Sequence, residues 1–264
     1  MTIFGVKINA YLICVASGAA AAGLLFLFNF YFFQKRYKIA VKRCFLLFAI
    51  TGFCAAGGVA LSFLSHFFFV KNFWEYPVYY ALNVTGPQYF TTLTYFLPLF
   101  YFALKIFKFH SPLEGRPVRG VVAFFNLVLP SLVLFSAVAR IGCMFGGCCG
   151  GITINGFAVP AREFEFIFAL TALFIICYFQ YKNRNVNLFE KENGDIKFNY
   201  ALKYYYIYAI YRFFTDFLKD KEHMILVFNI FDVAQFLALI AIIYLTVNVV
   251  LPYFKKRKNP PLNQ

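Results

Sequence analysis

Seven apolar runs constrain the fold of this chain more than any other feature of its sequence. Each run holds at least 18 residues, and 62% of the whole chain is hydrophobic. A helix of about 20 apolar residues crosses a hydrocarbon core of roughly 30 Å, and a spanning backbone must pair its own polar groups. We therefore predict an all-α, polytopic integral membrane protein with about seven transmembrane helices. The predicted spans cover residues 8–33, 44–70, 76–104, 118–139, 164–181, 199–218 and 233–251.

The spans follow one another without a linker, a repeat or a low-complexity segment, so we predict a single transmembrane domain over residues 1–264. The first run, from Ile8 to Phe33, is too long for the apolar core of a signal peptide, and no cleavage motif of small residues follows it. We expect this run to remain as the first helix.

The basic residues predict how the helices are oriented. The formal net charge is +14, which in a soluble protein would suggest nucleic acid as a partner. In a membrane protein, basic loops instead mark the cytoplasmic side. Eighteen of the 25 Lys and Arg residues lie in or beside one set of loops, and seven lie on the opposite side. We therefore expect no nucleic-acid binding, an amino terminus outside and a carboxyl terminus inside.

The fourth predicted span ends in a glycine-rich segment beside a cation. Residues 139–151 read ARIGCMFGGCCGG, with five glycines and one alanine, so the backbone can bend tightly or approach a ligand. Arg140 lies at the edge of the hydrocarbon, and a cation beside exposed amides is typical of a phosphate site. The alternative is an arginine that extends to the interface, followed by a flexible loop.

Two further charged segments lie on the same predicted side of the membrane. The fifth span begins with Arg162, Glu163 and Glu165, at a position where acidic residues also stabilise an ordinary helix start. In the sixth span, Arg212 and Asp216 are four residues apart and therefore share one helix face. Charges inside an apolar run are functional candidates. The alternative is a structural ion pair that joins two helices.

The three segments together resemble the motifs of the bacterial prolipoprotein diacylglyceryl transferases. That family has an Arg-x-Gly-Asn-Phe-x-Asn-Gly-Glu signature after its fourth span, with a further glycine beyond it. The residues that match this signature are Arg140, Gly142, Gly147 and Gly151. Cys143 stands where asparagine is usual, and Cys148 stands where glutamate is usual. Some members carry a Gly-Cys-Cys form similar to the one at residues 147–149.

Two later motifs of the family, Pro-x-Gln-x-Tyr-Glu and Arg-Phe-x-x-Glu, have counterparts in the same order. The residues at these motif positions are Pro160, Arg162, Phe164 and Glu165, followed by Arg212, Phe213 and Asp216. Arginine replaces glutamine at position 162, and aspartate replaces glutamate at position 216. Lys219 stands where a second arginine is common, and Gln235 fits a glutamine near the start of the last span. The resemblance covers residues 120–250.

One residue that the family leads us to expect is absent. Typical members have a His-Gly-Gly segment in the third span, and its histidine is important for their activity. Residues 85–100 of the third span read TGPQYFTTLTYFLPLF and include no histidine. His66 ends the second span and His110 lies in a cytoplasmic loop, both outside any matching motif. No catalytic histidine is therefore assigned, and residues 1–115 match the family in hydropathy alone.

The resemblance implies a transferase of the bacterial inner membrane whose site faces the outer side. The family moves a diacylglyceryl group from phosphatidylglycerol to the lipobox cysteine thiol of a prolipoprotein, releasing glycerol phosphate. Arg140 and Arg212 are then expected to bind phosphate, with Arg162 as a third cation, because arginine stabilises developing negative charge at a low-dielectric site. The thiol must lose its proton. Asp216 or Glu165 is expected to orient an arginine or to accept that proton.

The implied partners are phosphatidylglycerol or another anionic phospholipid, and a prolipoprotein lipobox or another thiol acceptor. No cofactor is implied, and a metal is disfavoured because no histidine lies near the cysteines. The other residues expected at the substrate site are Gly142, Cys143, Gly147, Gly151 and Gln235. Cys148 has several open roles: a thiolate in place of glutamate, a transient lipid carrier, or a disulfide with Cys149 or Cys143.

A second hypothesis comes from a different class of protein. The missing histidine and the replacement of glutamate by cysteine also fit a non-catalytic lipid-binding or accessory membrane protein on the same scaffold. A small-solute transporter is disfavoured, because neither inverted repeats nor broken helices in both halves are evident in the sequence.

Overall fold

The computed structural model describes residues 10–37, 41–67, 89–107, 117–146, 151–182, 200–219 and 230–251, together with residues 2–3, 6–7 and 226. The helices are α1 (Ala10–Tyr37), α2 (Val41–Phe67), α4 (Tyr89–Ile106), α5 (Pro117–Gly146), α6 (Ala161–Lys182), α7 (Tyr200–Thr215) and α8 (Val233–Leu245). A 3-10 turn, η1 (Asp216–Leu218), follows α7, and a π-helical turn, η2 (Thr246–Val250), follows α8. Two short hairpins pair β1 (Thr2–Ile3) with β2 (Val6–Lys7) and β3 (Thr153–Ile154) with β4 (Phe157–Ala158).

The all-α membrane architecture predicted from the sequence is confirmed. Five described helical segments are long and apolar enough to cross a membrane, namely α1, α2, α5, α6, and α8 together with η2. The shorter helix α7 falls within the sixth predicted span, and α4 overlaps the third predicted span and ends two residues beyond it, at Ile106. Residues 68–70 and 76–88, which were also predicted to lie in spans, are outside the described residues.

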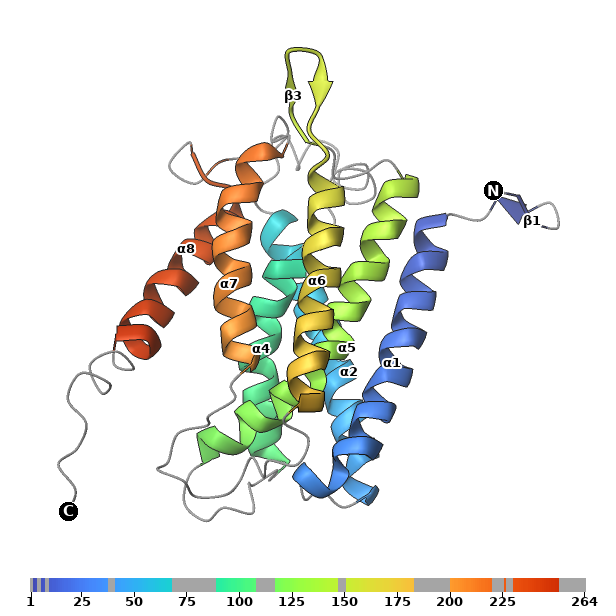
Figure 1. The fold of residues 1–264 in the computed structure, drawn as a ribbon, viewed down its shortest axis with the longest axis vertical. Helices are drawn as coiled ribbons and strands as arrows, with labels where there is room; N and C mark the ends of the chain where they lie inside the picture. The colour runs from blue at the N-terminus through green and yellow to red at the C-terminus, as the bar shows by residue number, and fades with distance from the viewer. Residues whose placement is uncertain are drawn as a thin grey trace.

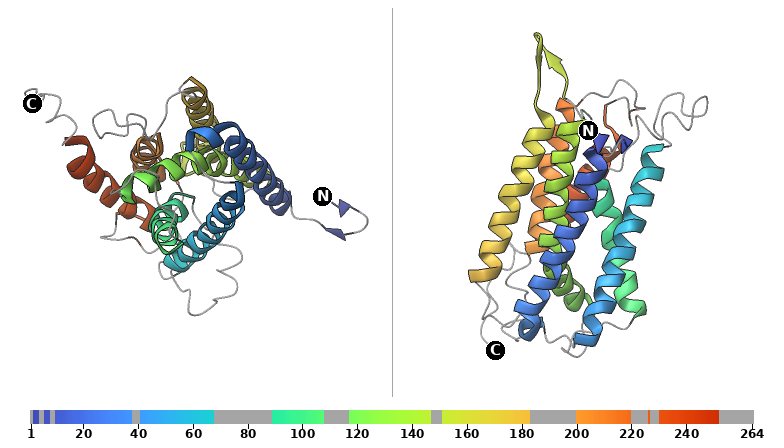
Figure 2. Two further views of the ribbon diagram at one scale, coloured as in Figure 1. Left: turned by 90° about the horizontal axis from the view of Figure 1, so that it is seen from below. Right: turned by 90° about the vertical axis from the view of Figure 1, so that its right-hand side faces the viewer.

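The helices run side by side, with α5 near the middle of the bundle (Figures 1 and 2). Helices α1 and α6 pack along α5, α2 packs on α4, and α8 packs on α7. Since lipid tails are as apolar as the helix surfaces, close packing depends on small residues at the contacts. Gly18 of α1 shows this, because a Cβ atom added there would lie 3.2 Å from Val138 of α5.

A buried polar contact joins three helices at the end of the bundle away from the β3–β4 hairpin (Figure 1). The main-chain oxygen of Asn126 on α5 accepts a hydrogen bond from the Gln180 side chain on α6, at 2.8 Å. The Asn126 side chain accepts one from the backbone N–H of Ala201 in α7, at 2.7 Å. The second hydrogen bond satisfies the backbone N–H of Ala201, which lies in the first turn of α7 and therefore lacks a partner within the helix. Together the two hydrogen bonds hold the start of α7 against α5 and α6.

Helix α5 extends beyond the predicted span of residues 118–139 and ends at Gly146. The expectation of exposed amides after Arg140 is therefore wrong for residues 141–146, because these residues continue the helix and their amides lie within its turns. Pro130 lies inside α5, and the ribbon bends between the two halves of the helix (Figure 1). Proline removes one helical hydrogen bond and produces such bends.

The β3–β4 hairpin extends past the helix ends (Figure 1) and connects α5 to α6. Its turn contains Asn155 and Gly156, both with positive φ, at 50° and 80°, as a two-residue hairpin with a type I′ turn requires. Before the hairpin, the backbone N–H of Ile152 donates to the carbonyl of Leu218 at 2.8 Å, and Gly151 pairs with Lys219. These contacts join the base of the hairpin to the end of η1.

Candidate functional site

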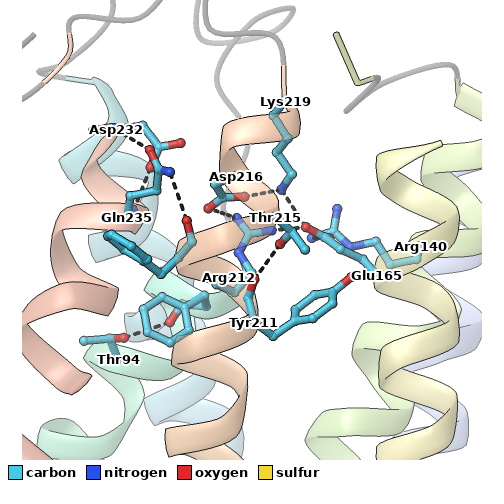
Figure 3. Close-up of polar contacts among 12 residues, drawn as sticks. Thr94, Arg140, Glu165, Tyr211, Arg212, Thr215, Asp216, Lys219, Asp232 and Gln235 are labelled. Carbon is cyan, nitrogen blue, oxygen red and sulfur yellow. Dashed lines mark hydrogen bonds and ion pairs between the residues drawn. The ribbon is translucent and has the colours of Figure 1, made fainter. Parts of the chain in front are cut away.

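Five charged side chains from different parts of the chain meet at the end of the bundle that carries the β3–β4 hairpin. They are Arg140 of α5, Glu165 of α6, Arg212 of α7, Asp216 of η1 and the adjacent Lys219. We call this group the ion cluster (Figure 3). Because α5, α6 and α7 each contribute to it, the ion cluster links three helices that follow one another in the chain.

Glu165 lies at the centre of the ion cluster and contacts all three of its cations. Its Oε1 atom contacts Nη1 of Arg212 and lies 2.6 Å from Nζ of Lys219. Its Oε2 atom contacts Nη2 of Arg140. Glu165 is only 3% exposed, and a carboxylate at such depth requires ionic partners. The helix start of α6 therefore supplies the anion that holds the cations together.

Arg212 and Asp216 form the most deeply buried part of the ion cluster, and both residues are 0% exposed. Nη2 of Arg212 lies 2.9 Å from Oδ2 of Asp216, as the four-residue spacing predicted. Nζ of Lys219 lies 3.0 Å from Oδ1 of the same aspartate. Both terminal nitrogens of Arg212 thus contact carboxylates, one on α6 and one on its own chain segment. The contact between Arg212 and Glu165 joins α7 to α6, so the arrangement includes an ion pair between helices, which the sequence analysis gave as the alternative to a functional site.

The ion cluster carries an excess of positive charge. Three cations and two carboxylates are in contact, so the sum of their formal charges is +1. Its most accessible cations are Lys219 and Arg140, whose side chains are 13% and 10% exposed. Among these five described side chains one positive charge is in excess, and an anion that binds beside Lys219 and Arg140 would offset it. The electrostatics of the ion cluster therefore favour an anionic ligand.

Arg162 and Cys143 lie next to Arg140 without joining the ion cluster. Arg162 forms an ion pair with Glu163 at 3.1 Å and donates a hydrogen bond to the carbonyl of Cys143 at 3.5 Å. Nη1 of Arg140 lies 3.9 Å from Sγ of Cys143. Cys143 is buried and is present as a thiol, so the structure does not show the disulfide that the sequence left open for it.

Gln235 binds backbone at the start of α8. Its backbone N–H donates to Oδ1 of Asp232 at 2.7 Å, and its own Oε1 accepts from the Asp232 backbone at 3.2 Å. This reciprocal pair is a capping box. The Gln235 side chain also donates to the carbonyl of Phe213 at 3.1 Å (Figure 3). Gln235 was expected at the substrate site, and the structure places it as a link between α8 and the segment next to Arg212.

The sequence as a whole matches the family model described as prolipoprotein diacylglyceryl transferase over residues 1–251. The chain belongs to this family. No curated protein and no solved structure gives a further match. The prolipoprotein diacylglyceryl transferases are membrane-embedded transferases of bacterial lipoprotein biosynthesis, and they act on lipids and prolipoprotein acceptors. The family predicted from three motifs is confirmed.

The structure brings together four residues that were given roles from the family motifs and a fifth, Lys219, that was matched only to a motif position. Arg140, Glu165, Arg212 and Asp216 come from three separate motifs and all lie in the ion cluster. Lys219 was given no chemical role from the sequence, although it contacts both carboxylates. The spacing of three residues between Asp216 and Lys219 could have predicted their contact, because residues three apart share a helix face.

The other predicted positions are distributed as follows. Gly142 is buried within α5, two residues beyond Arg140 of the ion cluster. Gly147, Cys148 and Cys149 lie outside the described residues, so their predicted roles stay predictions. The side chains of His66 and His110 are also outside the described part of the chain.

Gly151 was predicted at the substrate site, and its surroundings explain why a glycine is needed there. A Cβ atom at this position would collide with the carbonyl oxygen of Val159 and would lie 3.0 Å from that of Leu218. We expect Gly151→Ala to push the base of the hairpin away from η1, to move Lys219, and to lower the free energy of unfolding by about 1–3 kcal/mol. Unfolding in detergent, followed by circular dichroism, measures this effect.

The control for this variant is Gly52→Ala. Gly52 lies inside α2, and nothing lies within 4 Å of the Cβ position there. Alanine is a better helix former than glycine by about 0.8–1.0 kcal/mol, so Gly52→Ala should leave stability unchanged or raise it. Equal stability of the two variants would contradict the packing role of Gly151.

Proposed function

We propose that this protein transfers a diacylglyceryl group from phosphatidylglycerol to the cysteine thiol of a prolipoprotein. The observation that carries the proposal is the excess positive charge of the buried ion cluster. A phospholipid phosphate carries one negative charge, which matches the +1 sum of the five side chains. Family membership supports the same chemistry.

The proposed reaction exchanges one bond for another at a glyceryl carbon. The acceptor thiol loses its proton to a carboxylate of the ion cluster, Glu165 or Asp216, and the thiolate sulfur attacks the carbon that carries the phosphate oxygen. A carbon–sulfur bond forms, the carbon–oxygen bond breaks, and its electron pair moves to the oxygen of the departing glycerol phosphate. The phosphate thereby changes from one negative charge to two. Cations fixed beside that oxygen stabilise the transition state more than the ground state.

Arg140 and Lys219 are the best placed to contact phosphate, because they are the most accessible cations of the ion cluster. Arg212 is fully buried between Glu165 and Asp216, so it adds charge to the site and fixes the positions of both carboxylates. Glu165 and Asp216, with three and two cationic contacts, are suited to orienting these cations. We also propose that one of these two carboxylates accepts the proton of the acceptor thiol.

The proposed orientation has the ion cluster on the outer side of a bacterial inner membrane. The basic residues Lys105 and Lys182 end α4 and α6 at the opposite end of the bundle (Figure 1). Basic residues are typical of the cytoplasmic ends of helices. In this orientation the ion cluster can meet lipids of the outer leaflet and a translocated acceptor.

The test uses the purified protein in liposomes with a lipobox peptide, analysed by mass spectrometry. We expect a diacylglyceryl thioether with phosphatidylglycerol and roughly tenfold less product with phosphatidylethanolamine, a difference of about 1.4 kcal/mol. The ammonium group of phosphatidylethanolamine opposes the positive cluster, which is the reason for the preference. A peptide with serine in place of the cysteine should give no thioether.

One observation favours the alternative of a lipid-binding or accessory protein. The third predicted span includes no histidine, although a histidine there is important in typical members. If no donor yields product while phosphatidylglycerol remains bound to the purified protein, the accessory function replaces the transferase proposal. Growth of a transferase-depleted strain that expresses this chain provides an independent check.

A further inference from the structure

An open apolar groove lies between α6 and α7, directly beside the ion cluster. Its volume is about 360 Å³, and it is lined by Phe164, Ile167, Phe168, Thr171, Tyr211 and Thr215. The α6 segment is apolar and long enough to span the membrane, so the groove opens toward hydrocarbon. Glu165 of the ion cluster follows Phe164 on α6, and Arg212 follows Tyr211 on α7. The groove therefore lies at the same end of α6 and α7 as the ion cluster.

Tyr211 lies at the boundary between the groove and the ion cluster. Its ring stacks on Phe168 of α6, with ring centroids 4.1 Å apart and planes inclined by 19°. Stacking holds the ring in place, and the hydroxyl end points toward the contact between Arg140 and Glu165 (Figure 3). The same side chain thus presents an apolar face to the groove and a polar end to the charged residues.

The Tyr211 hydroxyl is buried and forms no hydrogen bond with the residues that the structure describes. Buried tyrosine hydroxyls normally have a hydrogen-bond partner. The other tyrosines of α7 include two whose hydroxyls are paired, Tyr205 with Thr94 and Tyr206 with Thr246, each at 2.9 Å. A donor without a partner, aimed at a positively charged site, is suited to an acceptor oxygen that a ligand supplies.

We propose that Tyr211 is a substrate-binding residue that donates a hydrogen bond to a phosphate oxygen of a glycerophospholipid. In this arrangement Arg140 contacts the same phosphate, and an acyl chain of the lipid occupies the groove beside Phe168. The occupant follows from the chemistry of the site, since an apolar groove meets an excess of positive charge. The inference rests on the proposed function for the identity of the lipid, but it concerns binding and does not require transfer.

The test is Tyr211→Phe, which removes the hydroxyl and keeps the ring that stacks on Phe168. Native mass spectrometry of the purified protein measures the fraction bound to added phosphatidylglycerol or to diacylglycerol, which lacks the phosphate. We expect Tyr211→Phe to weaken phosphatidylglycerol binding about tenfold and to leave diacylglycerol binding unchanged. In the transfer assay, the KM for phosphatidylglycerol should rise by the same factor with kcat preserved.

Tyr206→Phe is the matched control, because it removes a hydroxyl of the same helix that contacts Thr246 instead of the ion cluster. Its phosphatidylglycerol binding should equal that of the unaltered protein. Unchanged phosphatidylglycerol binding by Tyr211→Phe overturns the inference, and so does an equal loss of binding for both lipids. If the unaltered protein binds phosphatidylglycerol without transferring it, the proposed function fails, and the binding comparison still decides the role of Tyr211.

Discussion

Replacement of Arg140 by alanine should lower diacylglyceryl transfer roughly 100- to 1,000-fold, the loss typical for one charge-stabilising group at an enzyme site. Arg140 is one of the two most accessible cations of the ion cluster, and its removal changes the formal charge of that cluster from +1 to zero. The site then lacks the excess charge that favours a phosphate group. Product formation by membranes that carry equal amounts of the two proteins measures the effect.

Two further variants separate loss of chemistry from loss of folding. Arg140→Lys keeps the charge but not the planar guanidinium group, so we expect activity between that of the alanine variant and that of the unaltered protein. Lys105→Ala removes one exposed positive charge at the far end of α4 and should leave transfer unchanged. Full activity of Arg140→Ala would exclude Arg140 as a phosphate ligand.

Replacement of Glu165 by glutamine should lower the free energy of unfolding by about 3–5 kcal/mol, the cost of breaking a buried ion pair. Glu165 contacts all three cations of the ion cluster. Without the charge of Glu165, Asp216 is the one carboxylate left in the ion cluster, and the formal charge of the five side chains rises from +1 to +2. Thermal unfolding of the purified protein in detergent, together with its yield in membranes, measures the loss.

A double variant tests whether charge balance is the cause. Adding Lys219→Met to Glu165→Gln returns the formal charge of the ion cluster to +1, so part of the lost stability should return. For residues in contact, the interaction energy from such a cycle is about 0.5–3 kcal/mol. Glu163→Gln is the control, because the Glu163 side chain is 40% exposed and contacts Arg162 outside the ion cluster. Its effect should stay within about 1 kcal/mol.

The charged residues of the site were accessible from sequence because they are rare in apolar runs. Arg140, Glu165 and Arg212 stand out for that reason, and the spacing of Arg212 and Asp216 predicted their contact, which the structure confirms. The central position of Glu165 was not predictable. It contacts Arg212 across 47 positions of the chain, and helical periodicity describes only neighbours within a few turns.

The prediction of an exposed backbone after Arg140 was wrong, because the glycine content suggested more backbone flexibility than the packed helix allows. Glycines after Arg140 indicated a loop, but α5 continues to Gly146, since packing on α1 and α6 can override the weak helix propensity of glycine. The substrate-binding roles of Gly151 and Gln235, which were assigned from their motifs alone, stay predictions. In the structure Gly151 allows close backbone packing, and Gln235 caps α8 and binds the Phe213 carbonyl.

The sequence by itself determined the helical membrane fold, because hydrocarbon imposes one requirement on every spanning segment: its backbone must be paired within the segment. It also determined the family, through the order of three charged motifs. The tertiary structure decided how those charges combine. Only the packing of α5, α6 and α7 shows that two carboxylates and three cations share one buried site with a remaining positive charge, because charge balance depends on distances in space.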